Sequence, residues 1–236
     1  RQLVEQAAGL RRVNERLTRI DSQKDDFLSQ ISHEVRTPMS SIRSFSEILL
    51  HAPDLGRAQS ERYLRIIHDE SLRMTRLLDG ILDLGALEGG GAPWTLAPMD
   101  PEAALDNALR ICGGLAPAKG LRLISGERAA GARVLADVDR LSQVFINLLS
   151  NAIKYNDAAE PWVRVDSAIV DGRYEVVVED NGPGIPEGDR EEIFSKCSRG
   201  WAHTQSATQG AGLGLAISWQ IVRRLDGTRE LRPSRG

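Results

Sequence analysis

The sequence predicts a multidomain chain: an all-α antiparallel helical hairpin that dimerises into a four-helix bundle, followed by an α/β sandwich. Apolar residues recur at helical spacing over about the first 90 positions, with one interruption at residues 51–56. A glycine-rich stretch at residues 88–93 then separates two regions of different patterning. Beyond it, helical periodicity alternates with two β-like runs at residues 162–169 and 173–179.

The first helix is predicted from a seven-residue repeat. The repeat comprises Leu3, Leu10, Leu17, Lys24 and Ile31, with Val13, Ile20 and Phe27 at the intermediate step. This pattern favours a coiled coil of parallel helices from two chains, and a single amphipathic helix packed on its own core is the alternative. In this register His33 lies off the seam and faces solvent or a partner.

A second helix is expected from about Ser60 to Glu88, after the turn-forming sequence HAPDLG at residues 51–56. Its apolar stripe again alternates by three and four positions. Two long helices joined by a short turn form a hairpin that cannot bury such a stripe alone, so a homodimer is expected.

The rest of the chain is predicted to form the sandwich. Helices are expected near residues 100–113, 137–156 and 212–225, and the two β runs are joined by the hairpin signal Asp171-Gly172. No internal repeat is visible.

Composition narrows the functional classes. The formal net charge of −3 gives no reason to expect nucleic-acid binding or contact with an anionic membrane surface. Cys112 and Cys197 show no CxxC spacing, which speaks against a disulfide scaffold and a zinc site. No apolar run is long enough to span a membrane. Because the sequence begins with Arg1 and no signal peptide precedes it, we expect a soluble piece of a longer protein.

The stretch SQISHEVRTPMSSI, residues 29–42, contains a proline inside a helical pattern. Pro38 cannot donate to the carbonyl of Glu34, which costs about 3 kcal/mol in a helix interior. The breaker lies just beyond His33, and we interpret it as permitting a bend there, through which a catalytic domain reaches the histidine.

Two asparagines on one helix suggest a ligand site. In DRLSQVFINLLSNAIKYN, residues 139–156, Asn147, Asn151 and Lys154 share a helix face. The amides are explained either by buried polar neighbours or by a magnesium site, where a neutral amide oxygen supplements phosphate charge. In the second case Lys154 offsets phosphate charge and Tyr155 lies against a base.

Two glycine-rich stretches add weaker signals. In VVVEDNGPGIP, residues 176–186, a β run ends at Asp180, whose carboxylate is suited to accept from the N6 amine of adenine. A ligand-free turn would use the same residues. In GAGLGLAISWQIV, residues 210–222, alternating glycines open onto a helix N-terminus that suits phosphate, although such a run occurs in many loops. The segment between these stretches suits a lid over a nucleotide.

Together, in this order, the stretches resemble the bacterial sensor histidine kinases of two-component signalling. FLSQISHEVRTP resembles the H box, NLLSNAIKY the N box, DNGPGIP the G1 box, EEIFSKCSRG the F box and GAGLGLAIS the G2 box. The second domain is similar to the ATPase group of Hsp90, MutL and type II topoisomerases, which implies the Bergerat (GHKL) fold.

The resemblance implies residue roles, with ATP and Mg²⁺ as cofactors. His33 is the phosphoacceptor, Glu34 the base that takes its proton, and Thr37 the residue that orients water during dephosphorylation of the partner. Asn151 holds the metal and Asp180 binds adenine. Further nucleotide contacts are implied for Asn147, Lys154, Tyr155, Gly182, Gly184, Ile185, Arg199, Gly210, Gly212, Leu213, Gly214 and Leu215.

The implied organisation is a signalling coiled-coil helix at residues 1–24, a dimerisation and phosphotransfer domain at 25–90, and a catalytic ATP-binding domain at 91–236. The implied activity is that of a protein-histidine kinase that passes the phosphoryl group to the receiver domain of a response regulator. The fragment is expected to be cytoplasmic, with an upstream sensor anchoring the parent protein in the bacterial inner membrane.

Two departures from the family pattern stand out. Cys197 occupies the position of a second aromatic residue in the F box, which predicts looser lid packing. The final Gly-x-Gly-Thr-x-Phe pattern is missing, so either the chain is trimmed or the sheet lacks its last strand. Two rival functions follow from the same features: a non-catalytic dimerisation module that binds nucleotide, and a serine-directed kinase of the same ATPase group.

Overall fold

The structure, a computed structural model, describes residues 2–52, 54–88, 94–190, 192–194 and 213–231. The chain divides into two compact units, residues 1–79 and 80–236. The linker predicted at residues 88–93 lies almost entirely outside the described residues.

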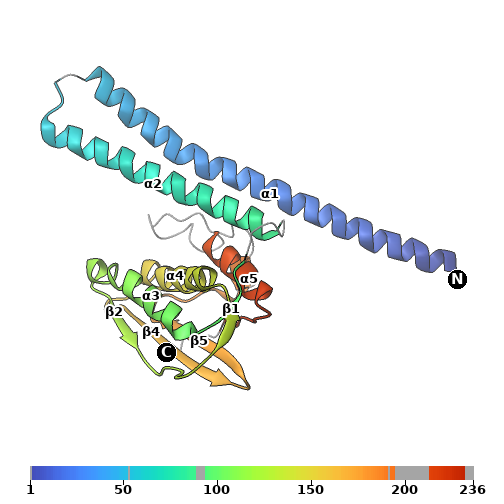
Figure 1. The fold of residues 1–236 in the computed structure, drawn as a ribbon. Helices are drawn as coiled ribbons and strands as arrows, with labels where there is room; N and C mark the ends of the chain where they lie inside the picture. The colour runs from blue at the N-terminus through green and yellow to red at the C-terminus, as the bar shows by residue number, and fades with distance from the viewer. Residues whose placement is uncertain (1, 53, 89–93, 191, 195–212, 232–236) are drawn as a thin grey trace. The chain divides into compact units, whose positions relative to one another are not determined.

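The first unit is the predicted helical hairpin. Helix α1 runs over Gln2–His51 and α2 begins at Arg57 and ends at Glu88, so the turn lies where HAPDLG places it (Figure 1). Residues 80–88 at the end of α2 are counted with the second unit. α1 continues through Pro38, whose side chain is fully buried. A proline is tolerated here because burial of its ring compensates for part of the lost hydrogen bond.

The hairpin has a narrow interior and leaves much apolar surface uncovered. Leu77 is 4% exposed, and the rings of Phe45 and Tyr63 pack with centroids 5.1 Å apart. The exposed apolar side chains of this unit include Leu17, Leu28, Met39, Ile48, Leu50, Leu64, Leu72 and Leu78. Two helices alone therefore do not bury the stripes that the sequence carries.

The second unit has the helices that the sequence predicts. They are α3 (Pro101–Gly113), α4 (Val138–Lys154) and α5 (Gly214–Arg224). The carboxylate of Asp137 begins α4 by accepting hydrogen bonds from the backbone N–H groups of Asp139 and Arg140, at 3.1 and 3.2 Å. Burial opposes ionisation of this carboxylate, but its backbone donors outweigh burial and the pKa of Asp137 is lowered.

Two small sheets accompany these helices. β2 (Arg122–Ser125) pairs in parallel with β4 (Trp162–Val170), which pairs antiparallel with β5 (Arg173–Asp180). β1 (Ala97–Met99) and β3 (Val134–Ala136) form a separate antiparallel pair. The predicted β4–β5 turn is present, with Asp171 and Gly172 both at positive φ, 49° and 73°.

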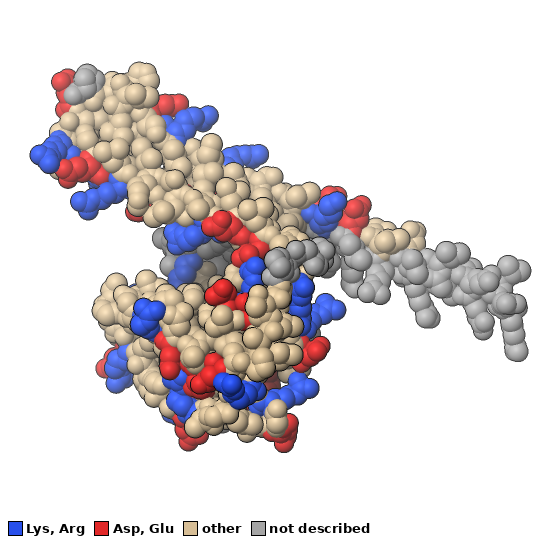
Figure 2. Space-filling model, viewed as in Figure 1, with Lys and Arg blue, Asp and Glu red and all other residues tan. Residues whose placement is uncertain are grey.

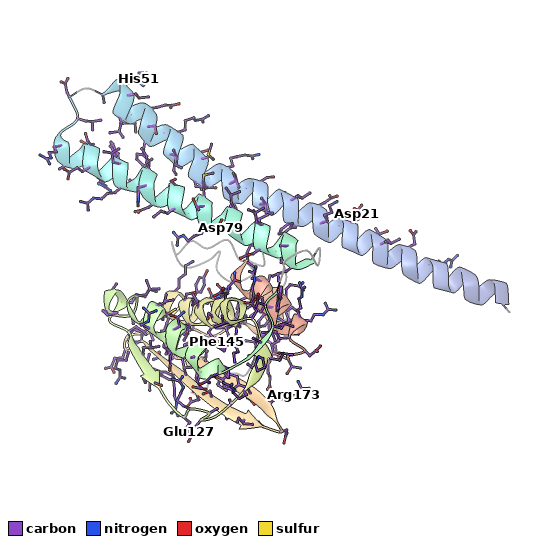
Figure 3. The ribbon with its side chains drawn as sticks, in the orientation of Figure 1. Asp21, His51, Asp79, Glu127, Phe145 and Arg173 are labelled. Atoms are coloured by element: carbon purple, nitrogen blue, oxygen red, sulfur yellow. The ribbon has the colours of Figure 1, made fainter. Side chains whose placement is uncertain are left out.

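The core of the second unit lies between the helices and the three-stranded sheet. Figure 1 shows α3, α4 and α5 as a layer on one side of that sheet, which is the predicted α/β sandwich. Phe145, labelled in Figure 3, projects from α4 and is 4% exposed. The fully buried side chains of the second unit include Leu105, Cys112, Leu149, Val163, Val165 and Ile221. α4 is therefore fixed by its apolar face, which leaves its asparagine-bearing face for other contacts.

A polar cluster around Glu102 ties the start of α3 to the sheet. Its carboxylate accepts from Ser167 Oγ at 2.6 Å, from Tyr174 Oη at 2.8 Å and from Arg128. Burial alone would raise the pKa of Glu102, but these donors and the charge of Arg128 outweigh it and the pKa is lowered. The cluster thus holds the start of α3 against the sheet, and none of its residues belongs to a predicted motif.

Charges are mixed on the visible surface of the second unit. Figure 2 shows acidic and basic side chains interspersed on that face, with neither sign gathered into a broad patch. Within the described part of the chain, no helix combines the length and apolarity that crossing a bilayer requires.

Candidate functional site

His33 and Glu34 are neighbours in sequence but occupy different environments on α1. The His33 side chain is exposed, whereas Glu34 is 6% exposed and faces the interior of the hairpin. Glu34 Oε2 lies 3.5 Å from Arg73 Nη2, and Arg73 Nη1 lies 3.5 Å from Glu70 Oε2. The hairpin thus presents an imidazole to solvent, and the next residue along α1 is a buried carboxylate whose charge is balanced by an arginine of α2.

Thr37 lies one helical turn beyond His33 and is exposed. Its hydroxyl donates to the carbonyl of His33 at 3.2 Å, as threonine often does in helices. The hydroxyl is therefore adjacent to the histidine and bonded to the backbone. Its role in orienting water stays a prediction.

On α4 the two asparagines make different contacts. Asn147 Nδ2 donates to the carbonyl of Gly214 at 3.1 Å and to Ser218 Oγ at 3.2 Å, so this amide joins α4 to the start of α5. Asn151 is half-buried, and its side-chain amide makes no hydrogen bond to another of the described residues. The buried-neighbour interpretation thus fits Asn147, whereas Asn151 keeps its amide available for a ligand.

The end of α4 carries Lys154 and Tyr155. Lys154 Nζ lies 3.4 Å from Tyr155 Oη and 4.9 Å from the centroid of the tyrosine ring. Burial raises the pKa of Tyr155, so the phenol stays neutral. A cation beside a half-buried ring is compatible with the predicted phosphate and base contacts, which remain predictions.

The end of β5 forms a crowded turn that requires glycine. The backbone N–H of Gly182 donates to Asp180 Oδ1 at 2.9 Å. A Cβ at Gly182 would lie 2.8 Å from that oxygen and 3.3 Å from Asn156 Cα. Gly184 has φ of +72°, a left-handed conformation that favours glycine. Next to it, the carbonyl of Ile185 accepts from Arg190 Nε at 3.3 Å.

Asp180 is a partly buried acid with a perturbed pKa. Burial raises the pKa of its carboxyl, the nearby charge of Glu179 adds to this, and the Gly182 N–H only partly opposes them. A desolvated acceptor of this kind binds an N–H donor strongly, because the donor restores the interactions that water provided.

Replacing Asp180 by asparagine should weaken adenine-nucleotide binding about tenfold to hundredfold, since a hydrogen bond to a charged group contributes about 1.5–3 kcal/mol. In the unmodified chain, affinity should fall on acidification above the pH at which an ordinary aspartate protonates. A raised folded-state pKa means that proton uptake by Asp180 favours the folded state, so this loss of affinity is not unfolding. Calorimetric Kd values and thermal midpoints between about pH 5 and pH 8 test both signs.

The variant supplies the control for this pH series. Its affinity should be low and should lack the pH-dependent fall that protonation of Asp180 causes. If Asp180→Asn and the unmodified chain gave the same affinity over the whole series, Asp180 would not contact the nucleotide.

Sequence reasoning missed an amide pair that builds this turn. Asn156 Nδ2 donates to Asn181 Oδ1 and to the carbonyl of Trp162, each at 3.0 Å, and Asn181 Oδ1 also accepts from Trp162 N–H at 2.8 Å. Asn156 follows α4 and Asn181 follows Asp180, so the pair joins two predicted motifs. The available signal in the sequence was an asparagine directly after Tyr155 and another directly after Asp180.

The remaining predicted residues divide between described and undescribed parts of the chain. Leu213 is buried, and Gly214 and Leu215, at the start of α5, are half-buried. Arg199, Cys197, Gly210 and Gly212 lie outside the described residues, as do residues 191 and 195–209 of the predicted lid.

Comparison with known proteins identifies both regions. Residues 23–90 match the family described as His Kinase A (phospho-acceptor) domain. Residues 136–236 match the family described as histidine kinase-, DNA gyrase B-, and HSP90-like ATPase.

Individual proteins agree with the family matches. Virulence sensor protein BvgS of Bordetella bronchiseptica is 33% identical over 90% of this chain, and aerobic respiration control sensor protein ArcB of Escherichia coli is 31% identical over 92% of it. The chain spans only 17% and 28% of these two relatives.

Two solved structures share the fold. Full-length ShkA in complex with AMPPNP has a TM-score of 0.57 at 27% identity, and the match covers 83% of this chain and 40% of that one. Histidine kinase ThkA in complex with response regulator protein TrrA has a TM-score of 0.67 at 21% identity, over 91% of this chain and 57% of that one. With a phospho-acceptor region around an exposed histidine and an ATPase region of the histidine kinase type after it, the chain belongs to the sensor histidine kinases.

Proposed function

We propose that this chain is an ATP-dependent protein-histidine kinase core that phosphorylates its own His33 and passes the phosphoryl group to an aspartate of a response regulator receiver domain. The observation that carries the proposal is the exposed His33 beside the buried, arginine-paired Glu34. An imidazole is a competent nucleophile near neutral pH, because its reference pKa is about 6.5.

In the proposed transfer, an imidazole nitrogen of His33 forms a bond to the γ-phosphorus as the bond to the β–γ bridging oxygen breaks. ADP leaves, and the imidazole N–H proton goes to a base, for which Glu34 is the candidate. Arg73 holds the carboxylate on the α2 side and compensates for its buried charge. In the second step the phosphoryl group moves from the histidine to the receiver aspartate, and the imidazole is regenerated.

The second unit supplies the nucleotide contacts in this proposal. Asp180 accepts from the adenine amine, Asn147 and Lys154 face the phosphates, and Asn151 is the protein ligand of Mg²⁺. The available donors fit this ion, since Mg²⁺ bound to a nucleotide takes most ligands from phosphates and water. Within the described residues, no three His, Cys, Asp or Glu side chains gather into a metal site. When bound, the ion neutralises phosphate charge.

Several observations support the proposed partners and context. The exposed apolar stripes of α1 and α2 favour a homodimer, formed by the predicted coiled coil of residues 1–24 and the phosphotransfer domain of residues 25–90. The catalytic domain is then residues 91–236. A complex of the related ThkA with a response regulator supports a receiver partner. The chain spans only 17% and 28% of the sensor proteins BvgS and ArcB, which supports a piece of a longer sensor protein. The proposal places this fragment in the cytoplasm, with an upstream sensor that anchors the parent protein in the membrane.

The direct test of phosphotransfer is to label the chain with γ-labelled ATP and chase the label into a purified receiver domain.

Thr37→Ala should label like the unmodified chain but should dephosphorylate the receiver about tenfold more slowly, because it lacks the hydroxyl that aligns water. The variant loses the hydrogen bond that the Thr37 hydroxyl donates to the carbonyl of His33 and keeps its backbone hydrogen bonds, so its helix should be intact. Thr37→Ser, which keeps the hydroxyl, is the control and should retain dephosphorylation. An equal loss of labelling and dephosphorylation in Thr37→Ala would assign Thr37 a structural role.

A further inference from the structure

Arg229 lies beyond α5 with its guanidinium in contact with two aromatic rings. Its Cζ is 3.5 Å from the ring centroid of Phe194 and 4.2 Å from that of Trp219. Desolvation lowers the pKa of Arg229, as expected for a cation that exchanges water for contact with two rings. A planar guanidinium stacks on both rings at once, an arrangement that an ammonium group cannot reproduce.

The two rings belong to segments that carry predicted nucleotide contacts. Phe194 ends the short 3-10 turn Glu192–Phe194, which follows the Asp180–Ile185 stretch. Trp219 lies on α5 next to Ser218, whose hydroxyl donates to the carbonyl of Gly214 at 2.9 Å. Asn147 donates to both of these α5 residues. The stack therefore joins the segment after β5 to the helix that begins with the G2 glycines.

The turn that precedes Arg229 is held by several contacts. The N–H of Gly227 donates to the carbonyl of Val222 at 2.9 Å, and a Cβ at Gly227 would lie 2.8 Å from Val222 Cγ1. The preceding residue, Asp226, has a positive φ of 54°, and its carbonyl accepts from Arg173 Nη1 at 3.4 Å. These contacts hold the backbone two residues before Arg229, which contacts the two rings from there.

We propose that Arg229 is a positioning residue for ATP: its stack sets the spacing between the segment that ends at Phe194 and helix α5. This inference rests on the proposed function, because the nucleotide is the substrate of the proposed kinase. Arg229 does not touch the reacting atoms. Its loss lets the two segments move apart, so the adenine and phosphate contacts no longer form together.

The test separates positioning from simple stabilisation. Arg229→Ala should raise KM for ATP about tenfold and change kcat less than about twofold, with a parallel rise in the Kd for ADP. Arg224→Ala is the matched control. Arg224 stacks on Trp94, with Cζ 4.6 Å from the ring centroid, and lies at the same end of α5 but does not bridge the two segments. Its KM and Kd should be unchanged.

A double-mutant cycle shows whether the stack itself is responsible. Phe194→Leu removes one ring and keeps an apolar side chain, so it should raise KM for ATP, as Arg229→Ala does. If the stack acts as a unit, the double variant should be no worse than the poorer single variant. Additive effects on KM would overturn the proposal. If Arg229→Ala lowers the thermal midpoint more than Arg224→Ala does, the cycle is repeated with Arg229→Lys under the same criteria.

Calorimetric measurement of ADP binding tests the proposed function and the positioning role of Arg229 separately. A chain that binds no nucleotide would contradict the proposed function as a whole. An unmodified chain that binds ADP, together with Arg229 variants that bind it equally well, would overturn the positioning role alone.

Discussion

Replacement of His33 by glutamine is expected to abolish phosphoryl incorporation from γ-labelled ATP and to leave the Kd for ATP unchanged. Glutamine offers no imidazole nitrogen to attack the γ-phosphorus. The side chain is exposed, so the substitution leaves no cavity and should move the thermal midpoint little. Autophosphorylation on gels, with calorimetric ATP binding on the same preparation, measures both quantities.

Other histidines of the first unit provide the internal check on this result. His51 is at the end of α1, with Nδ1 2.8 Å from the carbonyl of Glu47, and His68 Nδ1 lies 3.5 Å from Asp69 on α2 (Figure 3 labels His51). Both are exposed. Acid-labile label that persists in His33→Gln and disappears when His51 or His68 is also replaced would move the acceptor to that residue.

Replacement of Asn151 by aspartate is expected to reduce kcat/KM for Mg-ATP about a hundredfold, which corresponds to about 2.7 kcal/mol of transition-state stabilisation. An added carboxylate repels the triphosphate and changes the coordination of the metal that it binds. Initial rates of autophosphorylation over a range of Mg-ATP concentrations measure this loss.

The control for Asn151→Asp is the same substitution on a neighbouring helix. Asn107 lies on α3, outside every predicted motif, and its Oδ1 accepts from Arg110 Nη2 at 2.6 Å. Asn107→Asp changes the net charge equally and should leave kcat/KM near its original value. The thermal midpoint of Asn151→Asp should stay close to that of the unmodified chain, because the Asn151 amide makes no hydrogen bond to another described residue. Unchanged turnover in Asn151→Asp would place the metal elsewhere.

Long, periodic elements of the fold could be predicted from the sequence because their own residues specify them. α1, α2 and α4 each carry an apolar stripe at helical spacing, and Asp171-Gly172 encodes a two-residue turn by its positive φ values. β1, β2 and β3 were not predicted, since three or four residues are too few to show alternation. β2 exists only because β4, far along the chain, provides its parallel partner.

In the candidate site, too, local sequence specifies some features and contacts between distant residues specify others. Motif residues such as His33 and Asp180 could be recognised from their neighbours in sequence. The contacts that hold the site depend on residues brought together by folding: Arg73 beside Glu34, and Gly214 beside Asn147. No local pattern encodes how α2 is rotated against α1, or which face of α5 meets α4. The burial of Glu34 therefore became visible only in the structure.

The most direct test of the central claim is the chemical stability of the label that the unmodified chain acquires from γ-labelled ATP. A phosphorus–nitrogen bond to imidazole is broken by acid and survives alkali, whereas a serine or threonine phosphate ester survives acid. We expect label that is lost in acid, is retained in alkali and maps to the peptide containing His33. Acid-stable label, or nucleotide binding with no label at all, would contradict a histidine kinase.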